Sequence, residues 1–266
     1  MAITTLDQLT SALDSAKQSL NLYKVSATTK GAATALSLWT IAGNPGAGVA
    51  PTAASGAVTS STTAGAMNFS NPASGKTYLG KVAIASSVVG TMMIYDRLVH
   101  TGALSGAVAT AQTVNSVALT RSTTGAGVEL WCEIYTPTGA SAANLTVNYT
   151  NQAGTASRIS TSIAFPVSPV AGQMFQIPLA SGDTGVRSIQ SATLSATTGT
   201  AGAFGFTLLK RIATIPITLA NSGTTLDFAA LGLPTIDDNA CIASAVALCS
   251  GTTSGIIMAS MDLVQG

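Results

Sequence analysis

The fold class of this chain is indicated by the segment Val128–Tyr135, which reads Val-Glu-Leu-Trp-Cys-Glu-Ile-Tyr. Its alternate positions are apolar, and Glu129 and Glu133 stand between them. Side chains two residues apart lie on the same face of a β-strand. The segment therefore predicts a half-buried strand whose core-facing residues are Val128, Leu130, Cys132 and Ile134.

The sequence around this segment predicts further short strands separated by Gly, Pro, Asn and Thr clusters. The run Phe204–Leu209 is almost continuously apolar, which is typical of a strand buried on both faces. The last two segments are expected to form a hairpin around residues 251–255. The other expected strands are Val82–Ser86, Thr91–Val99, Thr113–Thr120, Leu145–Tyr149, Met174–Pro178, Ile189–Ala196, Ala240–Ser250 and Ile256–Val264. This pattern favours a mainly β fold, a jelly roll or β-sandwich.

One amphipathic helix is predicted near the N-terminus, over residues 5–22. Thr5 and Gln8 have the spacing of a capping box, which marks a helix start. An isolated helix of this length is marginal in water, so its apolar stripe must dock on another surface. That surface is either its own domain or a neighbouring subunit, and in the second case the contact residues are Leu6, Leu9, Leu13 and Leu20.

The stretch from Gly43 to Lys76 shows no regular period, because Gly, Pro, Ser and Thr interrupt it throughout. A loop of this length is unusual within a compact domain. We expect it to be disordered or to lie extended over another surface, where its small side chains let backbone approach backbone. The sequence thus predicts a helix and extended arm at residues 1–76 and a β-sandwich domain at residues 77–266.

The composition excludes several classes of protein. Of 266 residues, 11 are Lys or Arg and 10 are Asp or Glu, so charged residues make up 8%, against about a quarter in ordinary soluble domains. The net charge of +1 argues against charge-driven binding to nucleic acid or membrane. Mean hydropathy is +0.45, yet no long uninterrupted apolar run predicts a membrane helix. The first residues lack the features of a secretory signal, so we expect synthesis and assembly in the cytoplasm.

Candidate catalytic and ligand-binding motifs are weak. Residues 70–77 nearly match a phosphate-binding loop, but a strand is expected after them where that motif needs a helix. His100 is the single histidine and lacks a nucleophile elbow, so a strand-end or interface role is favoured over catalysis. Gly125–Gly127 lacks the third glycine of a dinucleotide fingerprint, and Asp237 and Asp238 predict a charged turn rather than a calcium site. No cofactor or metal is expected.

The remaining polar candidates favour structural roles. Glu129 and Glu133 lie about 13 Å apart on one strand face, which is too far for a glycosidase pair, so they are expected to be solvated or to face another subunit. Lys210 and Arg211 are adjacent basic residues, and they are expected to form an ion pair with an acidic side chain of another subunit. The three cysteines, Cys132, Cys241 and Cys249, are expected to be buried thiols.

Several segments resemble virion structural proteins of tailed bacteriophages, of the capsid-associated or decoration type. They are Ile94–Gly102, Leu104–Gly106, Gln112–Asn115, Gly182–Ser188 and Phe204–Leu209. The resemblance extends over most of residues 78–266 and implies a β-rich fold with no catalytic residues. The chain does not resemble a major capsid subunit of the tailed-phage fold.

Composition and resemblance together favour a structural protein of the virion and not an enzyme. Scarce charge and an amphipathic helix in need of a docking surface suit a subunit whose surface is covered by neighbours. We expect a minor head or decoration protein that stabilises the shell, with copies of itself and the major capsid protein as partners, and with no sequence-specific nucleic acid and no membrane among them. A tail, collar or fibre protein and a glycan-binding adhesin are the alternatives. An adhesin would need exposed aromatic residues in a groove.

Overall fold

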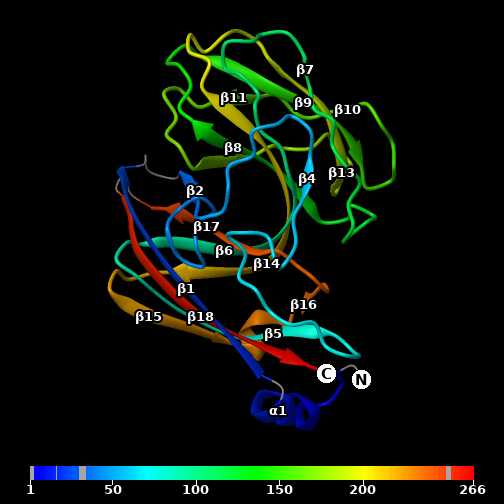
Figure 1. Cartoon of the computed structure of the whole chain (residues 1–266), viewed down its shortest axis with the longest axis vertical. Coiled ribbons are helices and arrows are strands. Elements are labelled where there is room, and N and C mark those ends of the chain that lie inside the picture. Colours follow the sequence, from blue (N-terminus) through cyan, green and yellow to red (C-terminus); the bar gives the residue numbers. More distant parts are fainter. Residues whose placement is uncertain (1–2, 16, 30–33, 250–252) are drawn as a thin grey trace. The chain divides into compact units, whose positions relative to one another are not determined.

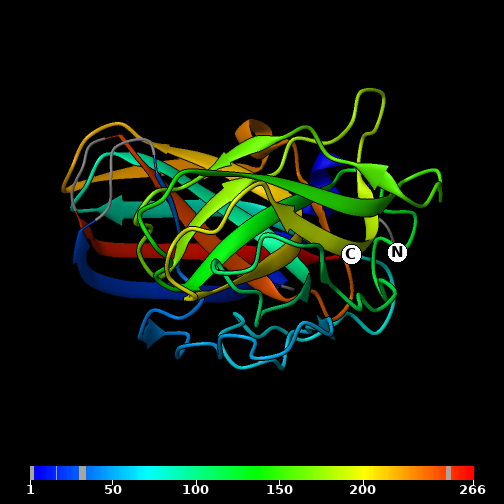
Figure 2. The ribbon, with the colours of Figure 1, turned by 90° about the horizontal axis from the view of Figure 1, so that it is seen from above.

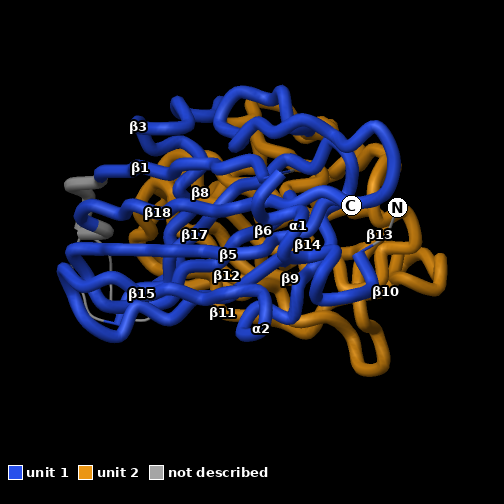
Figure 3. The backbone as a smooth tube through the Cα atoms, turned by 90° about the horizontal axis from the view of Figure 1, so that it is seen from below, with its two compact units in different colours: residues 1–49, 60–96, 212–266 blue, residues 50–59, 97–211 orange. Residues whose placement is uncertain are grey.

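The computed structural model describes residues 3–15, 17–29, 34–249 and 253–266, and it is mainly β, which confirms the expected fold class (Figure 1). The chain divides into two compact units (Figure 3). Unit 1 contains residues 1–49, 60–96 and 212–266, and unit 2 contains residues 50–59 and 97–211. The boundaries at 96/97 and 211/212 fall inside strands β6 (Gly90–His100) and β14 (Ala203–Ile217).

Unit 1 is built from two sheets that share one core. The first has the strand order β15-β5-β18-β1-β3 with β16 beside β5, and the second contains β2, β17 and the first part of β6. Side chains such as Val82 and Met261 from the first sheet, and Ile94 and Val246 from the second, pack in the same apolar cluster. The other elements are α1 (Leu6–Ser15), β1 (Lys17–Thr29), β2 (Ala35–Ser37), β3 (Gly43–Asn44), β5 (Thr77–Ser86), β15 (Ser222–Asp227), α2 (Phe228–Leu231), β16 (Thr235–Ile236), β17 (Ile242–Leu248) and β18 (Thr253–Gln265).

Unit 2 repeats the two-sheet plan around a second core. One sheet has the order β10-β9-β13-β7 with β11 beside β9, and β8 pairs with both β12 and the first part of β14. Tyr149, Ile189, Leu130 and Phe206 meet in its apolar cluster. Its strands are β4 (Ala57–Val58), β7 (Gln112–Thr113), β8 (Val128–Thr136), β9 (Ala143–Asn151), β10 (Arg158–Ile159), β11 (Ile163–Phe165), β12 (Gln173–Gln176) and β13 (Val186–Leu194).

The strands with the clearest sequence pattern lie where the pattern predicts. The four alternate apolar residues from Val128 to Ile134 are at most 1% exposed and belong to the unit 2 core. The six residues of Phe204–Leu209 are all buried, as expected of a strand covered on both faces. The expected strand Thr113–Thr120 is wrong beyond its first residue, because β7 ends at Thr113.

Helix α1 begins as predicted but ends at Ser15, so the predicted helix over 5–22 is too long. The capping box forms. The backbone N–H of Gln8 donates to Thr5 Oγ1 at 3.3 Å, and the backbone N–H of Thr5 donates to the side-chain Oε1 of Gln8 at 3.2 Å. From Lys17 the chain is strand β1, paired along most of its length with β18. Leu20 and Leu22 alternate with Asn21 and so follow the period of a strand, while the spacing from Leu13 to Leu20 also fits a helix.

The expected C-terminal hairpin does not form between its two segments. Strand β17 pairs with β2 and β6, whereas β18 pairs with β1 and β5 in the other sheet of unit 1. Both segments are apolar on alternate positions, and this pattern is the same for strands of one sheet or of two facing sheets. Part of the expected turn, residues 250–252, lies outside the described residues.

The segment Gly43–Lys76 is ordered and lies against its own chain, which corrects the expectation of disorder or of an arm laid over another surface. In unit 1, the ring of Trp39 packs on Gly48, where any Cβ would collide with the indole. In unit 2, the backbone of Gly102 approaches the carbonyl of Pro51 closely, and its amide donates to Ala53 O at 2.8 Å. The small residues serve the close approach that the sequence predicts, but within the chain.

The chain therefore does not divide at residues 76 and 77. Residues 34–49 and 60–76 belong to unit 1 together with most of the C-terminal third of the chain, and residues 50–59 belong to unit 2. Buried Lys24 holds part of this region by donating to Ile41 O and Pro45 O at 2.7 Å each. Contacts between residues far apart in sequence, which composition does not reveal, set the real boundaries.

Replacing Leu9 tests the docking of helix α1 on unit 1. Leu9 is 4% exposed and packs with Tyr78 and Val264, so Leu9→Ala is expected to lower the free energy of unfolding by about 2–4 kcal/mol. Leu6 is 61% exposed, so Leu6→Ala is the matched control and should stay within about 0.5 kcal/mol of wild type. Urea unfolding followed by circular dichroism measures both, and equal effects would contradict this packing.

Candidate functional site

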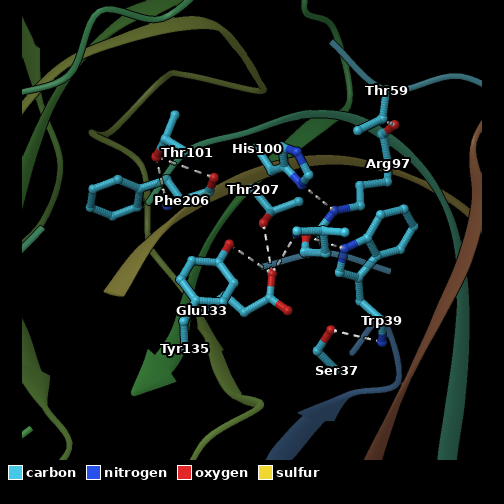
Figure 4. A network of polar contacts seen from close by, with 11 residues as sticks. Ser37, Trp39, Thr59, Arg97, His100, Thr101, Glu133, Tyr135, Phe206 and Thr207 are labelled. Carbon is cyan, nitrogen blue, oxygen red and sulfur yellow. Dashed lines mark hydrogen bonds and ion pairs between the residues drawn. The ribbon is translucent and has the colours of Figure 1, made fainter. Parts of the chain in front are cut away.

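A buried polar network in unit 2 is centred on an ion pair between Arg97 and Glu133 (Figure 4). Arg97 Nη2 lies 2.7 Å from Glu133 Oε2, and neither side chain is more than 2% exposed. The hydroxyls of Thr207 and Tyr135 donate to the same carboxylate oxygen at 3.0 and 3.2 Å. Strands β6, β8 and β14 each contribute to the network, so it joins three strands of the unit.

The irregular segment 50–59 is tied to the same network. The Thr59 hydroxyl donates to the backbone carbonyl of Arg97. Arg121 Nη1 donates to Thr59 O at 2.8 Å, and Arg121 Nη2 donates to Arg97 O at 3.3 Å. The guanidinium group of Arg121 and the backbone carbonyl of Arg97 thus help to position a segment that has little regular structure of its own.

His100 lies at the end of β6, which confirms the expected strand-end position. Arg97 Nε donates to its Nδ1 at 3.3 Å, so the imidazole is neutral and carries its proton on Nε2. Burial, and next the positive charge of Arg97, lower the pKa of His100 to about 4, although Glu133 acts in the opposite direction. A histidine that accepts from a cation in this way is a poor general base.

The thiol of Cys132 and the hydroxyl of Tyr135 lie near Glu133 and are held in their protonated forms. Burial, and then the charge of Glu133, raise the pKa of the Cys132 thiol and that of the Tyr135 hydroxyl well above their usual values. A thiol rather than a thiolate is a weak nucleophile. The arrangement is therefore suited to holding strands together.

Glu133 is buried and Glu129 is 18% exposed and ion-paired within the chain, which corrects the expectation that both are solvated or face another subunit. Glu133 is buried in the network above, and Glu129 makes a two-pronged ion pair with Arg211, with Nε–Oε1 at 2.8 Å and Nη2–Oε2 at 3.0 Å. Trp131 Nε1 also donates to Glu129 at 2.7 Å. Arg211 therefore pairs within the chain and not between subunits, because the antiparallel register of β8 and β14 brings the two side chains together.

A second polar cluster, which the sequence did not reveal, surrounds Asp183 in unit 2. Its carboxylate accepts from Tyr149, Asn151 and Arg158 at 2.5, 2.7 and 2.9 Å. The Tyr149 hydrogen bond is the largest cause that lowers the pKa of Asp183 to about 2. The partners are distant in sequence, so only the fold shows that this aspartate anchors a loop.

The four residues expected to contact a neighbouring subunit do not form one surface. Leu9 is buried and Leu13 half-buried against unit 1, and Leu20 lies on β1 beside the unit 1 core. Leu6 is mostly exposed. The helix thus uses its stripe on its own unit, which was one of the two readings the sequence left open.

An exposed apolar surface, also missed from the sequence, lies on the outward side of the β15-β5-β18-β1 sheet in unit 1. Tyr23 and Val25 on β1 pair directly with Met258 and Ile256 on β18, and all four side chains are more than 40% exposed. Around this patch, residues 256–259 of β18 are apolar on both faces of the strand, whereas an exposed sheet face is usually polar. That double pattern was the available sequence signal. A contiguous exposed apolar patch marks an interaction site.

The other candidates resolve simply. Residues 70–76 lead into strand β5 and not into a helix, and Asp237–Asp238 lies at a turn, both as predicted. Cys132 and Cys241 are buried, but Cys249 is exposed, which corrects the expectation for that thiol. Within the described ranges, no group of three metal-ligating side chains comes together. No helix among these residues is long and apolar enough to cross a membrane.

Comparison with known proteins gives no family. No protein-family model matches the chain, and no curated protein matches it. Among solved structures, the VP2 subviral particle of infectious bursal disease virus is 10% identical, with 92% of this chain and 80% of that chain covered and a TM-score of 0.22. The T13 particle of the same virus is 8% identical, with 95% and 79% covered and a TM-score of 0.22. At TM-scores this low, the similarity does not establish a shared fold.

The buried histidine predicts acid sensitivity. Because the pKa of His100 is lower in the folded state than its ordinary value of 6.5, the unfolded chain binds the proton first, and stability falls as the pH drops from about 6.5 to 4. The expected loss is about 3 kcal/mol at pH 4. His100→Gln removes this titration, so the difference in unfolding free energy between pH 7 and pH 4 should be smaller in the variant. An equal difference in both proteins would contradict a neutral buried imidazole.

The ion pair predicts a strongly non-additive mutant cycle. Arg97→Met or Glu133→Leu leaves a buried charge unpaired, and each is expected to lower the free energy of unfolding by about 3–5 kcal/mol. The double variant removes both charges and should lose much less than the sum of the two. Urea unfolding of the four proteins measures the coupling. Additive losses would show that the two groups do not depend on each other.

Proposed function

We propose that this chain is a structural subunit of a virus particle. More specifically, it is a decoration or minor head protein of a tailed bacteriophage, bound to the outside of the shell. The segments that resemble tailed-phage virion proteins support the virus class. The nature of the folded surface supports the structural role.

The observation that carries the proposal is how little charge the surface holds. Of the 21 charged residues, six form ion pairs within unit 2, and Lys24 and Asp96 are buried. Arg158 and Arg211 of these pairs are still 35% and 33% exposed, so at most seventeen charged side chains, all except Lys24, Asp96, Arg97 and Glu133, share an accessible surface of 10,487 Å². Charge keeps soluble monomers apart, whereas its depletion is typical of surfaces that are covered in an assembly.

Such a surface suits a subunit that is repeated many times on a shell. Copies with a net charge of +1 repel one another little when they are closely spaced. Each contact contributes modestly, and icosahedral repetition multiplies it. The same near-neutral surface gives no basis for holding nucleic acid, which requires several cationic contacts.

The partners in this role are further copies of the chain and the major capsid protein. Among the four leucines considered above, Leu6 has the side chain available to a shell contact, since Leu9, Leu13 and Leu20 pack within unit 1. The chain acts mechanically in this proposal, through buried contact area and without catalysis. Assembly takes place in the host cytoplasm and leaves the protein in the virion.

Labelling of particles tests the proposal. Virions are purified on a density gradient from a lysate of a culture that carries the gene, and gold-labelled antibody to this protein is located by electron microscopy. Label distributed over the head supports the decoration role. Label confined to the tail or fibres would overturn that role while leaving a virion role intact. Absence of the protein from gradient-purified particles, checked by mass spectrometry, would overturn both.

A further inference from the structure

The outward face of the β15-β5-β18-β1 sheet carries large and small side chains on opposite halves. These four strands lie side by side in unit 1 (Figure 3). On β1 and β18 the exposed residues are Tyr23, Val25, Ile256 and Met258, which together form a ridge. On β5 and β15, Ala85 and Gly223 lie in the row of Met258 and Tyr23, whereas Ala83 and Thr225 lie in the next row, with Ser260 and Asn21.

The small residues beside the ridge leave a shallow hollow of about 430 Å³, whose lining includes Ala85, Gly223, Thr225 and the flanks of Tyr23 and Met258. Ridge and hollow therefore lie next to each other on one face. A surface with a projection and a recess of similar extent is the requirement for packing against itself.

We propose that this face binds a second copy of the same chain. The two copies are related by a two-fold axis that runs parallel to the strands, between β5 and β18. The sheets then pack face to face, as the layers of a β-sandwich do. This inference does not depend on the proposed role in a virus particle.

The two-fold axis matches large residues with small ones in the row that contains Tyr23 and Met258. It places β18 of one copy over β5 of the other and β1 over β15. In the row Gly223–Ala85–Met258–Tyr23, given by the strand registers, Met258 faces the partner's Ala85 and Tyr23 faces the partner's Gly223. Exchanging the two copies by the two-fold rotation gives the same two pairs again. Tyr23 and Met258 of each copy therefore fill the hollow of the other copy.

The same operation matches the charges. On the outward face of β5, Lys81 lies two rows beyond Ala85, and its register partner on β18 is Asp262. The axis places Lys81 opposite the partner's Asp262, and Asp262 opposite the partner's Lys81. Asp227 on β15 faces the partner's Ser19, whose hydroxyl donates to Asp262 within its own chain. Sliding one copy along the strands by two residues would separate both ion pairs.

The area of the face is sufficient for a modest dimer. Four strands at a spacing of about 4.8 Å and seven residues at about 3.3 Å each give a flat footprint of roughly 450 Å² per copy. Side-chain relief adds to this, so the two copies together reach the total of about 1,000 Å² that a specific interface needs. The expected dissociation constant is in the micromolar range.

Gly223 offers the cleanest test, because a Cβ at this residue meets no atom within 4 Å in the chain itself. Gly223→Glu should fold normally, yet it places a charge where the partner's Tyr23 must lie. Gly46→Glu is the matched control, since a Cβ there also meets nothing and Gly46 follows β3, outside the four strands of this face. Circular dichroism and thermal unfolding confirm the folded state of each variant.

Sedimentation velocity over a range of concentrations up to about 200 µM measures association in the micromolar regime. Wild type and Gly46→Glu are expected to approach twice the chain mass of 26.4 kDa. Gly223→Glu should dimerise at least about 100-fold more weakly, because it buries an unpaired charge. Wild type that stays monomeric overturns the proposal, even if Gly223→Glu also blocks incorporation into particles, which would assign the face to another protein.

A charge exchange tests the orientation of the two copies. Lys81→Asp and Asp262→Lys each place like charges opposite each other and should weaken the dimer about tenfold or more. The double variant restores opposite charges and should return the dissociation constant to within about threefold of wild type. A dimer or larger oligomer that none of these variants changes would overturn the proposed face.

Discussion

Close approach of backbone to backbone is the constraint on which much of this structure depends. The chain has few aromatic residues and few charges, so small side chains must fill and connect its layers. At Gly65 the backbone of Gly48 occupies the space of a missing Cβ, and at Gly102 the carbonyl of Pro51 does the same. These contacts let a long segment without regular structure lie directly on the sheets of its own chain.

The polar groups are subject to a similar constraint, because few of them are charged. Charged side chains are scarce, and six of them are spent on three ion pairs inside unit 2. The pair of Arg97 and Glu133 joins three strands, and the backbone carbonyl of Arg97 accepts a hydrogen bond from Thr59. Replacing water around two charges requires that each find partners, which hydroxyls of Thr207 and Tyr135 supply. The result is a rigidly specified interior and a nearly neutral exterior.

Local patterns in the sequence predicted local structure well and tertiary pairing poorly. The alternation in Val128–Tyr135 and the apolar run at Phe204–Leu209 placed two core strands, since burial of one or both faces is written in consecutive residues. The strand partner of β17 was not predictable, because the apolar patterns of β17 and β18 are the same whether the two strands pair in one sheet or lie in two facing sheets. The burial of Glu133 was missed for a related reason: its partner Arg97 lies on another strand, and only the fold brings a cation to it. The exposed ridge was overlooked because apolar residues on both faces of a strand suggest burial on both.

The distribution of thiols has a practical consequence. All three cysteines lie in the described part of the chain, and Cys249 is exposed while Cys132 and Cys241 are buried. A maleimide applied to the folded protein therefore reacts at one position per chain, without any engineered residue. Fluorescence attached there reports the number of molecules in a complex by stepwise bleaching, so stoichiometry is accessible in the native sequence.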